Sequence, residues 1–273
     1  MSEKYLISLD LDGTLLNSKN SITKYSEEII KKTIALGHKV MIASGRAPRA
    51  IRKYYNQLEL DTPIVCYNGA KIYDPKDANF NDIALKFPKE KILRFCSEFA
   101  DIVPGITCEN EDTIWTNEDD EYLFKFYIKD YMKFNLGNIH EILNKDPIIF
   151  IGKYIDTPEN RERIVNIVES NSDIKVRFWD SDNYFELYYE GVSKYNALLK
   201  IAEYYGIKEE NIYAFGDADN DIEVISHCSH GIAMKNSSPF LLNIAKNVTE
   251  YTNNEDGVAK YLENHIIKDG SFS

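Results

Sequence analysis

Two aspartates near the N-terminus have the types and the spacing for phosphoryl chemistry. Asp10 and Asp12 lie in the sequence DLDGT at positions 10–14, directly after the apolar run Tyr5–Leu9. Two carboxylates that leave a strand end two residues apart can face one site, because the following glycine permits a sharp turn. One carboxylate can attack phosphorus while the other passes protons. An ordinary acidic turn is the alternative, but this pattern arises by chance in about one of several hundred such chains.

Polar residues also follow apolar runs elsewhere in the chain. Three runs have this form: Lys39–Ala43 before Ser44, Gly45 and Arg46; Pro63–Tyr67 before Asn68 and Gly69; and Ile212–Phe215 before a turn with Asp217, Asn220 and Asp221. In an open parallel sheet, ligands bind just outside the carboxyl ends of the strands. We therefore expect these distant clusters to converge on one crevice.

The elements that must position these residues alternate between strand and helix. Helix start and stop signals bound Ser26–Leu36, Pro48 opens a helix that runs to about Leu58, and Val192–Tyr205 has apolar residues along one helical face before Gly206. Alternating strands and helices predict an α/β fold, in which a Rossmann-like parallel sheet has helices on both faces.

The middle of the chain has a different character. Strands and helices are still predicted between residues 82 and 187, but no strand there ends in a polar turn that contains glycine. The simplest organisation is a core domain formed by residues 1–81 and 188–273, with residues 82–187 inserted as an α+β domain. Predicted elements of this insert are helices at 89–100 and 157–169 and strands at 106–108, 113–116, 148–151, 175–179 and 184–188.

Composition narrows the class of protein. The 273 residues include 32 Lys plus Arg and 44 Asp plus Glu, which gives a net charge of −12 and argues against nucleic acid or an anionic membrane as the main partner. Four cysteines without a C-x-x-C pair indicate a reduced, intracellular protein. No signal peptide is evident and no run approaches the ~18 apolar residues of a membrane span, so we expect a cytoplasmic location.

These motifs together give the chain a resemblance to a known family. It resembles the haloacid dehalogenase (HAD) superfamily, specifically the Cof-type subfamily IIB phosphatases, which carry an inserted α+β cap domain of the C2 type. The likeness spans nearly the whole chain. It rests on DLDGT at 10–14, Ser44 in SGR at 44–46, Lys194 in GVSK at 191–194, GDADND at 216–221, NGA at 68–70 and EDGVA at 255–259.

The resemblance implies a catalytic role for each acid. Asp10 would attack phosphorus to form an aspartyl-phosphate, and Asp12 would protonate the leaving oxygen and later deprotonate water. Mg²⁺ would be held by Asp10, the backbone carbonyl of Asp12 and Asp217, with Asp221 supporting the site. The cation would offset the repulsion between the attacking carboxylate and the anionic substrate.

The resemblance also implies a set of phosphate-binding groups: the Leu11 amide, Ser44, the Gly45 amide, Lys194 and Asn220. Lys194 lies in the predicted first turn of a helix, where the helix dipole disfavours a cation, which suggests that its ammonium has a partner, with the phosphoryl group as the natural one. Arg46 can bind the phosphate or the leaving portion of the substrate, or can pair with a surface acid. Asn68 and Gly69 can contact the substrate or simply form a tight turn.

The implied function is hydrolysis of small phosphorylated metabolites, such as sugar phosphates, with the insert closing over the site and setting substrate choice. Two alternatives stay open. A phosphomutase would return the phosphoryl group to a sugar hydroxyl, and a non-catalytic sensor would only bind the metabolite. A dinucleotide-binding module is set aside, because the chain lacks the G-x-G-x-x-G and P-loop patterns. The substrate itself and the choice between monomer and homodimer stay undetermined.

Overall fold

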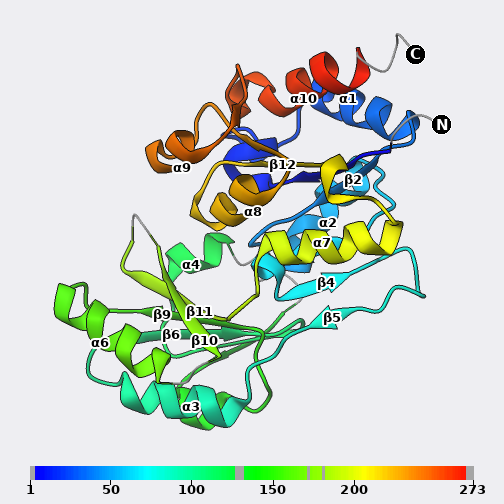
Figure 1. Ribbon diagram of the computed structural model, residues 1–273. Helices are drawn as coiled ribbons and strands as arrows, with labels where there is room; N and C mark the ends of the chain where they lie inside the picture. Colours follow the sequence, from blue (N-terminus) through cyan, green and yellow to red (C-terminus); the bar gives the residue numbers. More distant parts are fainter. Residues whose placement is uncertain (1–3, 127–131, 171–172, 180–181, 269–273) are drawn as a thin grey trace. The chain divides into compact units, whose positions relative to one another are not determined.

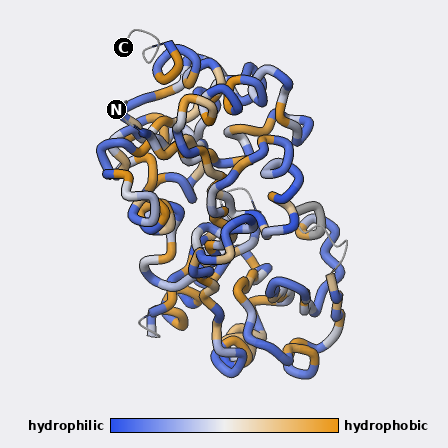
Figure 2. The backbone as a smooth tube through the Cα atoms, turned by 90° about the vertical axis from the view of Figure 1, so that its right-hand side faces the viewer, coloured by the Kyte–Doolittle hydropathy of each residue, from blue (hydrophilic) through white to orange (hydrophobic). Residues whose placement is uncertain are grey.

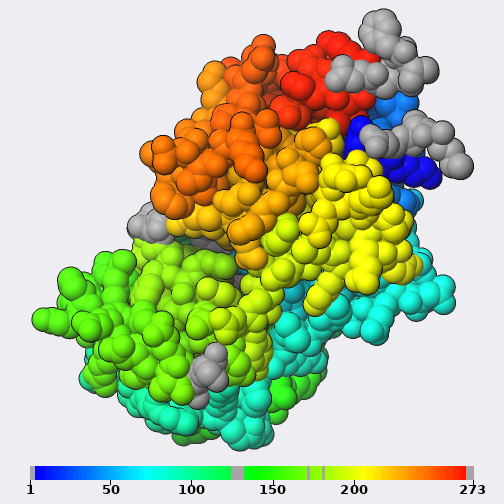
Figure 3. Space-filling model, viewed as in Figure 1, coloured from blue at the N-terminus to red at the C-terminus, as the bar shows by residue number. Residues whose placement is uncertain are grey.

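The structure is a computed structural model that describes residues 4–126, 132–170, 173–179 and 182–268. The chain divides into two compact units. The core unit consists of Met1–Ile83 and Ser193–Ser273, and the inserted unit consists of Ala84–Val192. In Figure 3, blue and yellow-to-red atoms belong to the core unit, and green atoms belong to the inserted unit. The unit boundaries differ by a few residues from those expected at 82 and 187.

A five-stranded parallel sheet forms the centre of the core unit. Its strand order is β14-β13-β12-β1-β2. The bounds are β1 Leu6–Leu9, β2 Lys39–Ile42, β12 Ile212–Gly216, β13 His230–Ala233 and β14 Asn247–Val248. Leu9 pairs with Ile42 on one side and with Phe215 on the other. The carboxyl ends of β1, β2 and β12 therefore lie together at one edge of the sheet.

Helices cover both faces of this sheet (Figure 1). On one side lie α1 (Lys24–Ala35) and α10 (Gly257–Leu262), and on the other lie α7 (Lys194–Tyr205) and α8 (Ile222–His227), which contacts β12 and β13. The predicted α/β fold with a parallel core sheet is confirmed. Two further helices of this unit are α2 (Pro48–Gln57) and α9 (Pro239–Ile244).

The third predicted strand has a different place from the one expected. β3 (Ile64–Cys66) pairs in antiparallel fashion with β4 (Lys71–Tyr73), and these two form a three-stranded sheet with β5 (Ile83–Ala84). A single parallel bridge between Ala43 and Val65 links β3 to the end of β2. The chain reverses directly after β3, so the returning β4 takes one hydrogen-bonding edge of that strand.

The inserted unit contains a six-stranded sheet in the order β10-β11-β9-β6-β7-β8. All neighbours are antiparallel except β7 and β8. The strand bounds are β6 Gly105–Glu109, β7 Thr113–Thr116, β8 Lys133–Leu136, β9 Ile149–Lys153, β10 Ile174–Phe178 and β11 Tyr184–Tyr189. The helix bounds are α3 Lys89–Glu98, α4 Glu121–Phe126, α5 Ile139–Ile142 and α6 Pro158–Glu169.

Each unit buries its own apolar residues. The inserted unit has a core of aromatic and aliphatic side chains that includes Phe99, Phe150 and Phe185, and the core unit has one that includes Leu6, Met41 and Leu198. Figure 2 shows apolar stretches recurring along the chain between hydrophilic turns and loops. Within the described part of the chain, no helix combines the length and the apolar character needed to cross a membrane.

Candidate active site

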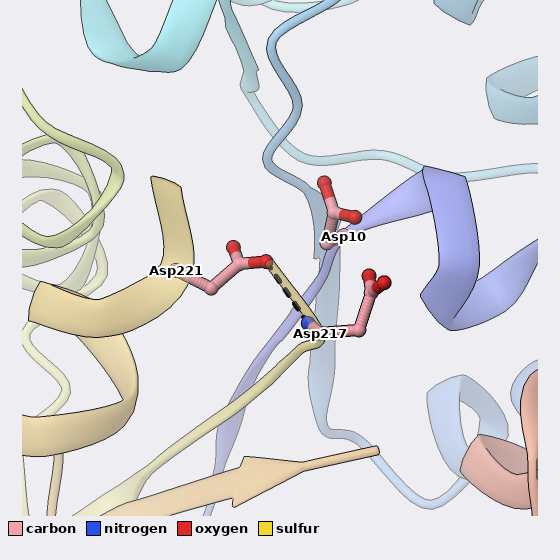
Figure 4. A group of neighbouring side chains, drawn as sticks. All are labelled: Asp10, Asp217 and Asp221. Carbon is pink, nitrogen blue, oxygen red and sulfur yellow. Dashed lines mark hydrogen bonds between the residues drawn. The ribbon is translucent and has the colours of Figure 1, made fainter. Parts of the chain in front are cut away.

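Three acidic side chains of the core unit meet at the carboxyl edge of its sheet (Figure 4). Asp10 follows β1, whereas Asp217 and Asp221 follow the neighbouring strand β12. Each offers a carboxylate oxygen, and these three oxygens lie within 4.8 Å of one another. Parallel pairing of β1 with β12 thus brings together acids that are far apart in the sequence.

Two glycines leave room for the acids. Gly13 has a φ of +70°, and a Cβ atom there would lie 2.1 Å from Oδ2 of Asp217. A Cβ atom on Gly216 would lie 2.3 Å from Cγ of Asp221. No other residue type could occupy either position without displacing a carboxylate, because real Cβ contacts are never this short.

Lys194 places its ammonium group between two of the three acids. Its Nζ donates to Oδ1 of Asp10 at 2.6 Å and to Oδ1 of Asp221 at 2.8 Å, and only 2% of the side chain is exposed. The residue begins α7, and the preceding Ser193 caps that helix by accepting a bond from the Asn196 amide. The partners of Lys194 in this structure are two carboxylates, and its contact with a phosphoryl group stays a prediction.

Burial and crowding shift the titration of the cluster. Burial raises the pKa of Asp10 well above its ordinary value, and Asp221 and Asp217 add to the increase while Lys194 opposes it. Burial, reinforced by the charge of Asp221, raises the pKa of Asp217 to about 7. Burial alone would lower the pKa of Lys194, but the two carboxylates outweigh it and the pKa is raised.

The cluster carries more negative than positive charge, so its chemistry fits a bound divalent cation. Oδ2 of Asp221 accepts hydrogen bonds from the backbone amides of Asp217 at 3.0 Å and Ala218 at 3.2 Å. Its other oxygen, Oδ1, accepts from Lys194. Thr14 donates to Oδ1 of Asp217 at 2.8 Å. Hard carboxylate oxygens are the ligands that Mg²⁺ and Ca²⁺ prefer. Asp10 and Asp217 could therefore hold such a cation, with Asp221 supporting them.

Arg46 makes a two-point ion pair with Asp12. Its Nε donates to Oδ2 of Asp12 at 2.7 Å, and its Nη2 contacts Oδ1 at 2.5 Å. The guanidinium carbon also lies 5.6 Å from the centre of the Tyr54 ring. Of the two roles left open for Arg46, the structure shows pairing with an acid, and that acid is the second aspartate of the DLDGT sequence. Contact of Arg46 with phosphate stays a prediction.

The remaining predicted residues lie in the same unit. Leu11 begins the turn Leu11–Leu15 after β1, in which Asp12 and Gly13 have non-helical backbone angles. Ser44 is buried just beyond β2 and its Oγ accepts a bond from the Arg46 amide at 3.2 Å, whereas Gly45 is exposed. Asn220 donates from Nδ2 to Oδ1 of Asn68 at 2.9 Å. Their contacts with phosphate stay predictions.

Thr14 and Gly216 lie beside the acids, although neither is among the predicted site residues. Thr14 orients Asp217 by a hydrogen bond, and Gly216 gives Asp221 its space. Both residues lie inside the quoted sequences DLDGT and GDADND. Their places within those sequences were the available signal, but their partners become visible only when β1 and β12 lie side by side.

Comparison with known proteins defines the class to which this fold and site belong. The chain belongs to the haloacid dehalogenase-like hydrolase family, whose model matches residues 7–262. Several of its relatives are named as phosphatases. It is 33% identical to the 5-amino-6-(5-phospho-D-ribitylamino)uracil phosphatase YitU of Bacillus subtilis, over 97% of this chain and 98% of that protein.

Solved structures agree with this assignment. A haloacid dehalogenase-like hydrolase from Bacteroides thetaiotaomicron is 26% identical, with a TM-score of 0.77 over 96% of this chain and 99% of the other. The fold is also similar to that of the HAD subclass IIB sugar phosphatase BT4131, with a TM-score of 0.76 at 22% identity over 96% of this chain and 98% of that one. The expected phosphatase class and HAD resemblance are confirmed.

Proposed function

We propose that this phosphatase is a Mg²⁺-dependent phosphomonoester hydrolase that acts on small phosphorylated metabolites through an aspartyl-phosphate on Asp10. One observation carries the proposal. Asp10 and Asp221, both buried, and the half-buried Asp217 form one group with the buried Lys194, at the edge of the sheet where ligands of open α/β folds bind.

Asp10 has the surroundings of a nucleophile in this proposal. Lys194 donates to its Oδ1 and holds the carboxylate in a fixed orientation. A carboxylate oxygen of Asp10 attacks phosphorus, a new P–O bond forms, and the bond to the leaving oxygen breaks as Asp12 supplies a proton to that oxygen. Lys194 also offsets part of the charge that builds up on the phosphoryl oxygens.

In the second step Asp12 accepts a proton instead of donating one. It takes a proton from a water molecule, the water oxygen bonds to phosphorus, and the bond from phosphorus to Asp10 breaks to release inorganic phosphate. The side chain of Asp12 is 52% exposed, and its ion pair with Arg46 has to open before Asp12 can carry a proton to the leaving oxygen. Arg46 holds that side chain through both of its carboxylate oxygens.

Asp10, Asp217 and the backbone carbonyl of Asp12 would hold the cation in this proposal, with Asp221 supporting them through its bonds to the Asp217 and Ala218 amides. When bound, Mg²⁺ would supply positive charge that polarises the phosphoryl oxygens. The raised pKa values of Asp10 and Asp217 support a cation here, because its charge would offset the burial and the like-charge repulsion that raise them.

Phosphate release from a panel of phosphorylated metabolites, with and without Mg²⁺, tests the proposed function. The panel should contain sugar phosphates and 5-amino-6-(5-phospho-D-ribitylamino)uracil, which the relative YitU is named for. Free inorganic phosphate supports hydrolysis, and an isomeric sugar phosphate instead would assign a phosphomutase. If neither a panel member nor p-nitrophenyl phosphate is turned over, the protein would be assigned as a non-catalytic sensor that only binds the metabolite.

Replacement of Asp217 should weaken the response to the metal. We expect Asp217→Asn to raise the Mg²⁺ concentration for half-maximal activity by at least about tenfold, because even outer partners of metal ligands contribute about 10–100-fold to affinity. Titration of activity with Mg²⁺ measures the shift. Asp219→Asn is the matched control, since Asp219 is exposed in the same turn. An unaltered titration for the Asp217 variant would remove this residue from the metal site.

We also propose that the inserted unit, Ala84–Val192, sets substrate choice as a cap domain. Its support is its position in the chain, between the residues Ser44 and Lys194 of the candidate site, and its separate core. Exchange of this unit with that of a family member of different preference should transfer the preference in the phosphate-release panel. A chimera that folds and keeps the original preference would assign the selection to the core unit.

A further inference from the structure

The loop that follows β3 has an unusual backbone. Tyr67, Asn68 and Gly69 have φ values of 50°, 54° and 108°, so three consecutive residues lie in the region that favours glycine. Only the third is glycine, and a bulky residue such as tyrosine is rarely found there. Strained backbone of this kind persists where the surrounding structure enforces it, and it gathers at functional sites.

Two parts of the candidate site hold this loop. The Asn68 amide donates to the Ser44 carbonyl at 3.1 Å, and the Tyr67 amide donates to the Arg46 carbonyl at 3.2 Å. On the other side, a Cβ atom on Gly69 would lie only 2.4 Å from the carbonyl oxygen of Ser193. Ser193 is the cap of α7, which begins at Lys194. The loop is therefore packed between the Ser44 turn and the start of the helix that carries the buried lysine.

The side chain of Asn68 reaches the third part of the site. Its Oδ1 accepts a hydrogen bond of 2.9 Å from Nδ2 of Asn220, a residue that lies 152 positions later in the same turn as Asp217 and Asp221. The amide nitrogen of asparagine carries two N–H groups, so this bond uses one of them. Gly45 makes room for the pair, since a Cβ atom there would lie 3.0 Å from Oδ1 of Asn68.

We infer that Asn68 is a positioning residue, which holds the Asn220 amide in the orientation that presents its second N–H to the phosphoryl group. The inference rests on the proposed function, in which Asn220 binds that group. It differs from direct substrate contact by Asn68, because here Asn68 acts through Asn220. The left-handed backbone serves this role, since it turns the Asn68 side chain toward Asn220 while its amide stays bonded to Ser44.

A double-mutant cycle tests this inference. Asn68→Gly keeps a residue that readily adopts the left-handed backbone but removes the acceptor, and Asn220→Ala removes the group that it positions. We expect Asn68→Gly to lower kcat/KM for p-nitrophenyl phosphate with Mg²⁺ by about tenfold, the effect of one lost transition-state hydrogen bond. In the Asn220→Ala background, the same change should cost less than about twofold.

Asn20→Gly is the matched control. Asn20 is exposed and has a φ of 52°, so this substitution makes the same chemical change in the same backbone conformation. It should leave kcat/KM unchanged. Thermal unfolding of each variant verifies folding. An NMR spectrum of the side-chain NH₂ groups of ¹⁵N-labelled protein provides a readout besides activity. The signals that disappear in Asn220→Ala identify the Asn220 amide, and they should shift in Asn68→Gly but not in Asn20→Gly.

Different results would contradict the role of Asn68 and the proposed function. If the effects of Asn68→Gly and Asn220→Ala multiply, or if Asn68→Gly has no effect, Asn68 does not act through Asn220 and the inference is overturned. The proposed function is intact in that case, provided that wild-type protein releases phosphate and Asp10→Asn does not. Wild-type protein that releases no phosphate, or Asp10→Asn protein that still does, would instead overturn the proposed function.

Discussion

Asp10→Asn is expected to lower phosphate release by at least about three orders of magnitude, because loss of a covalent nucleophile removes the pathway and not just one contact. The fold should be retained. Asparagine has nearly the same shape as aspartate, and its carbonyl oxygen can still accept the bond that Lys194 donates to Asp10. It also removes one charge from a group of three crowded acids.

Two measurements verify this result. Phosphate release under saturating Mg²⁺ gives the loss of activity, and brief incubation with radiolabelled substrate followed by acid quenching should label wild-type protein but not the variant. The melting temperature of Asp10→Asn should equal or exceed that of wild type, since burial and like charges raise the pKa of Asp10. A variant with near wild-type turnover would require another nucleophile.

Lys194→Met should affect both stability and activity. The ammonium group is buried between Asp10 and Asp221, and its removal leaves a buried cluster of acids without a cation. Breaking a buried pair by removal of one partner costs about 3–5 kcal/mol, so we expect a loss of that size in the free energy of unfolding at neutral pH without Mg²⁺. We expect kcat/KM to fall by about 10²–10³, as for loss of a charge-stabilising donor.

The destabilisation of Lys194→Met should depend on conditions. Added Mg²⁺ should recover part of the stability, because its charge replaces that of the ammonium group. Acidification should narrow the difference from wild type, because Asp10 and Asp217 have raised pKa values and take up protons as the pH falls through them, which removes the repulsion. Denaturant unfolding at several pH values measures both effects.

Lys200→Met is the matched control for this substitution. Lys200 is an exposed residue of the same helix, α7, and its replacement should change the free energy of unfolding by less than about 0.5 kcal/mol. If Lys194→Met were as stable and as active as this control, Lys194 would have no role in the site.

The position of the site at the carboxyl edge of the sheet could be predicted from the sequence, because a general rule of parallel sheets determines it. Strands of a parallel sheet end at the same edge, so the polar residues after Tyr5–Leu9, Lys39–Ala43 and Ile212–Phe215 had to meet if those runs were neighbouring strands. The register confirms this, with Leu9 paired to both Ile42 and Phe215. The α/β class followed from the same alternation of strands and helices.

Side-chain partners could not be predicted in the same way. Arg46 and Asp12 lie 34 residues apart, and their pairing depends on how the turns after β1 and β2 face each other. Lys194 reaches Asp10 only because α7 packs beneath the sheet with its first residue at the carboxyl edge. Sequence patterns report which face of an element is apolar, but they carry little information on such long-range contacts.

Short or exposed elements also could not be predicted from the sequence. β14 consists of only Asn247 and Val248, too few residues for a pattern. β8, Lys133–Leu136, alternates polar and apolar residues over only four positions, too short a run to predict a strand by itself, and it lies largely exposed at the edge of its sheet. β3 was predicted as a strand, but its pairing with β4 depends on the reversal at Tyr67–Gly69, which requires left-handed backbone at two non-glycine residues.

The split of the core unit into two chain segments has a consequence for biosynthesis. The ribosome releases β1 and β2 first, then the whole of Ala84–Val192, and only afterwards β12, which pairs with β1. The inserted unit is one contiguous segment, so it can fold before the two segments of the core unit pair. Domains generally fold as units during translation, and pairings between distant segments form slowly. A nascent chain therefore acquires its acid cluster only after the segment that carries Asp217 and Asp221 has left the ribosome.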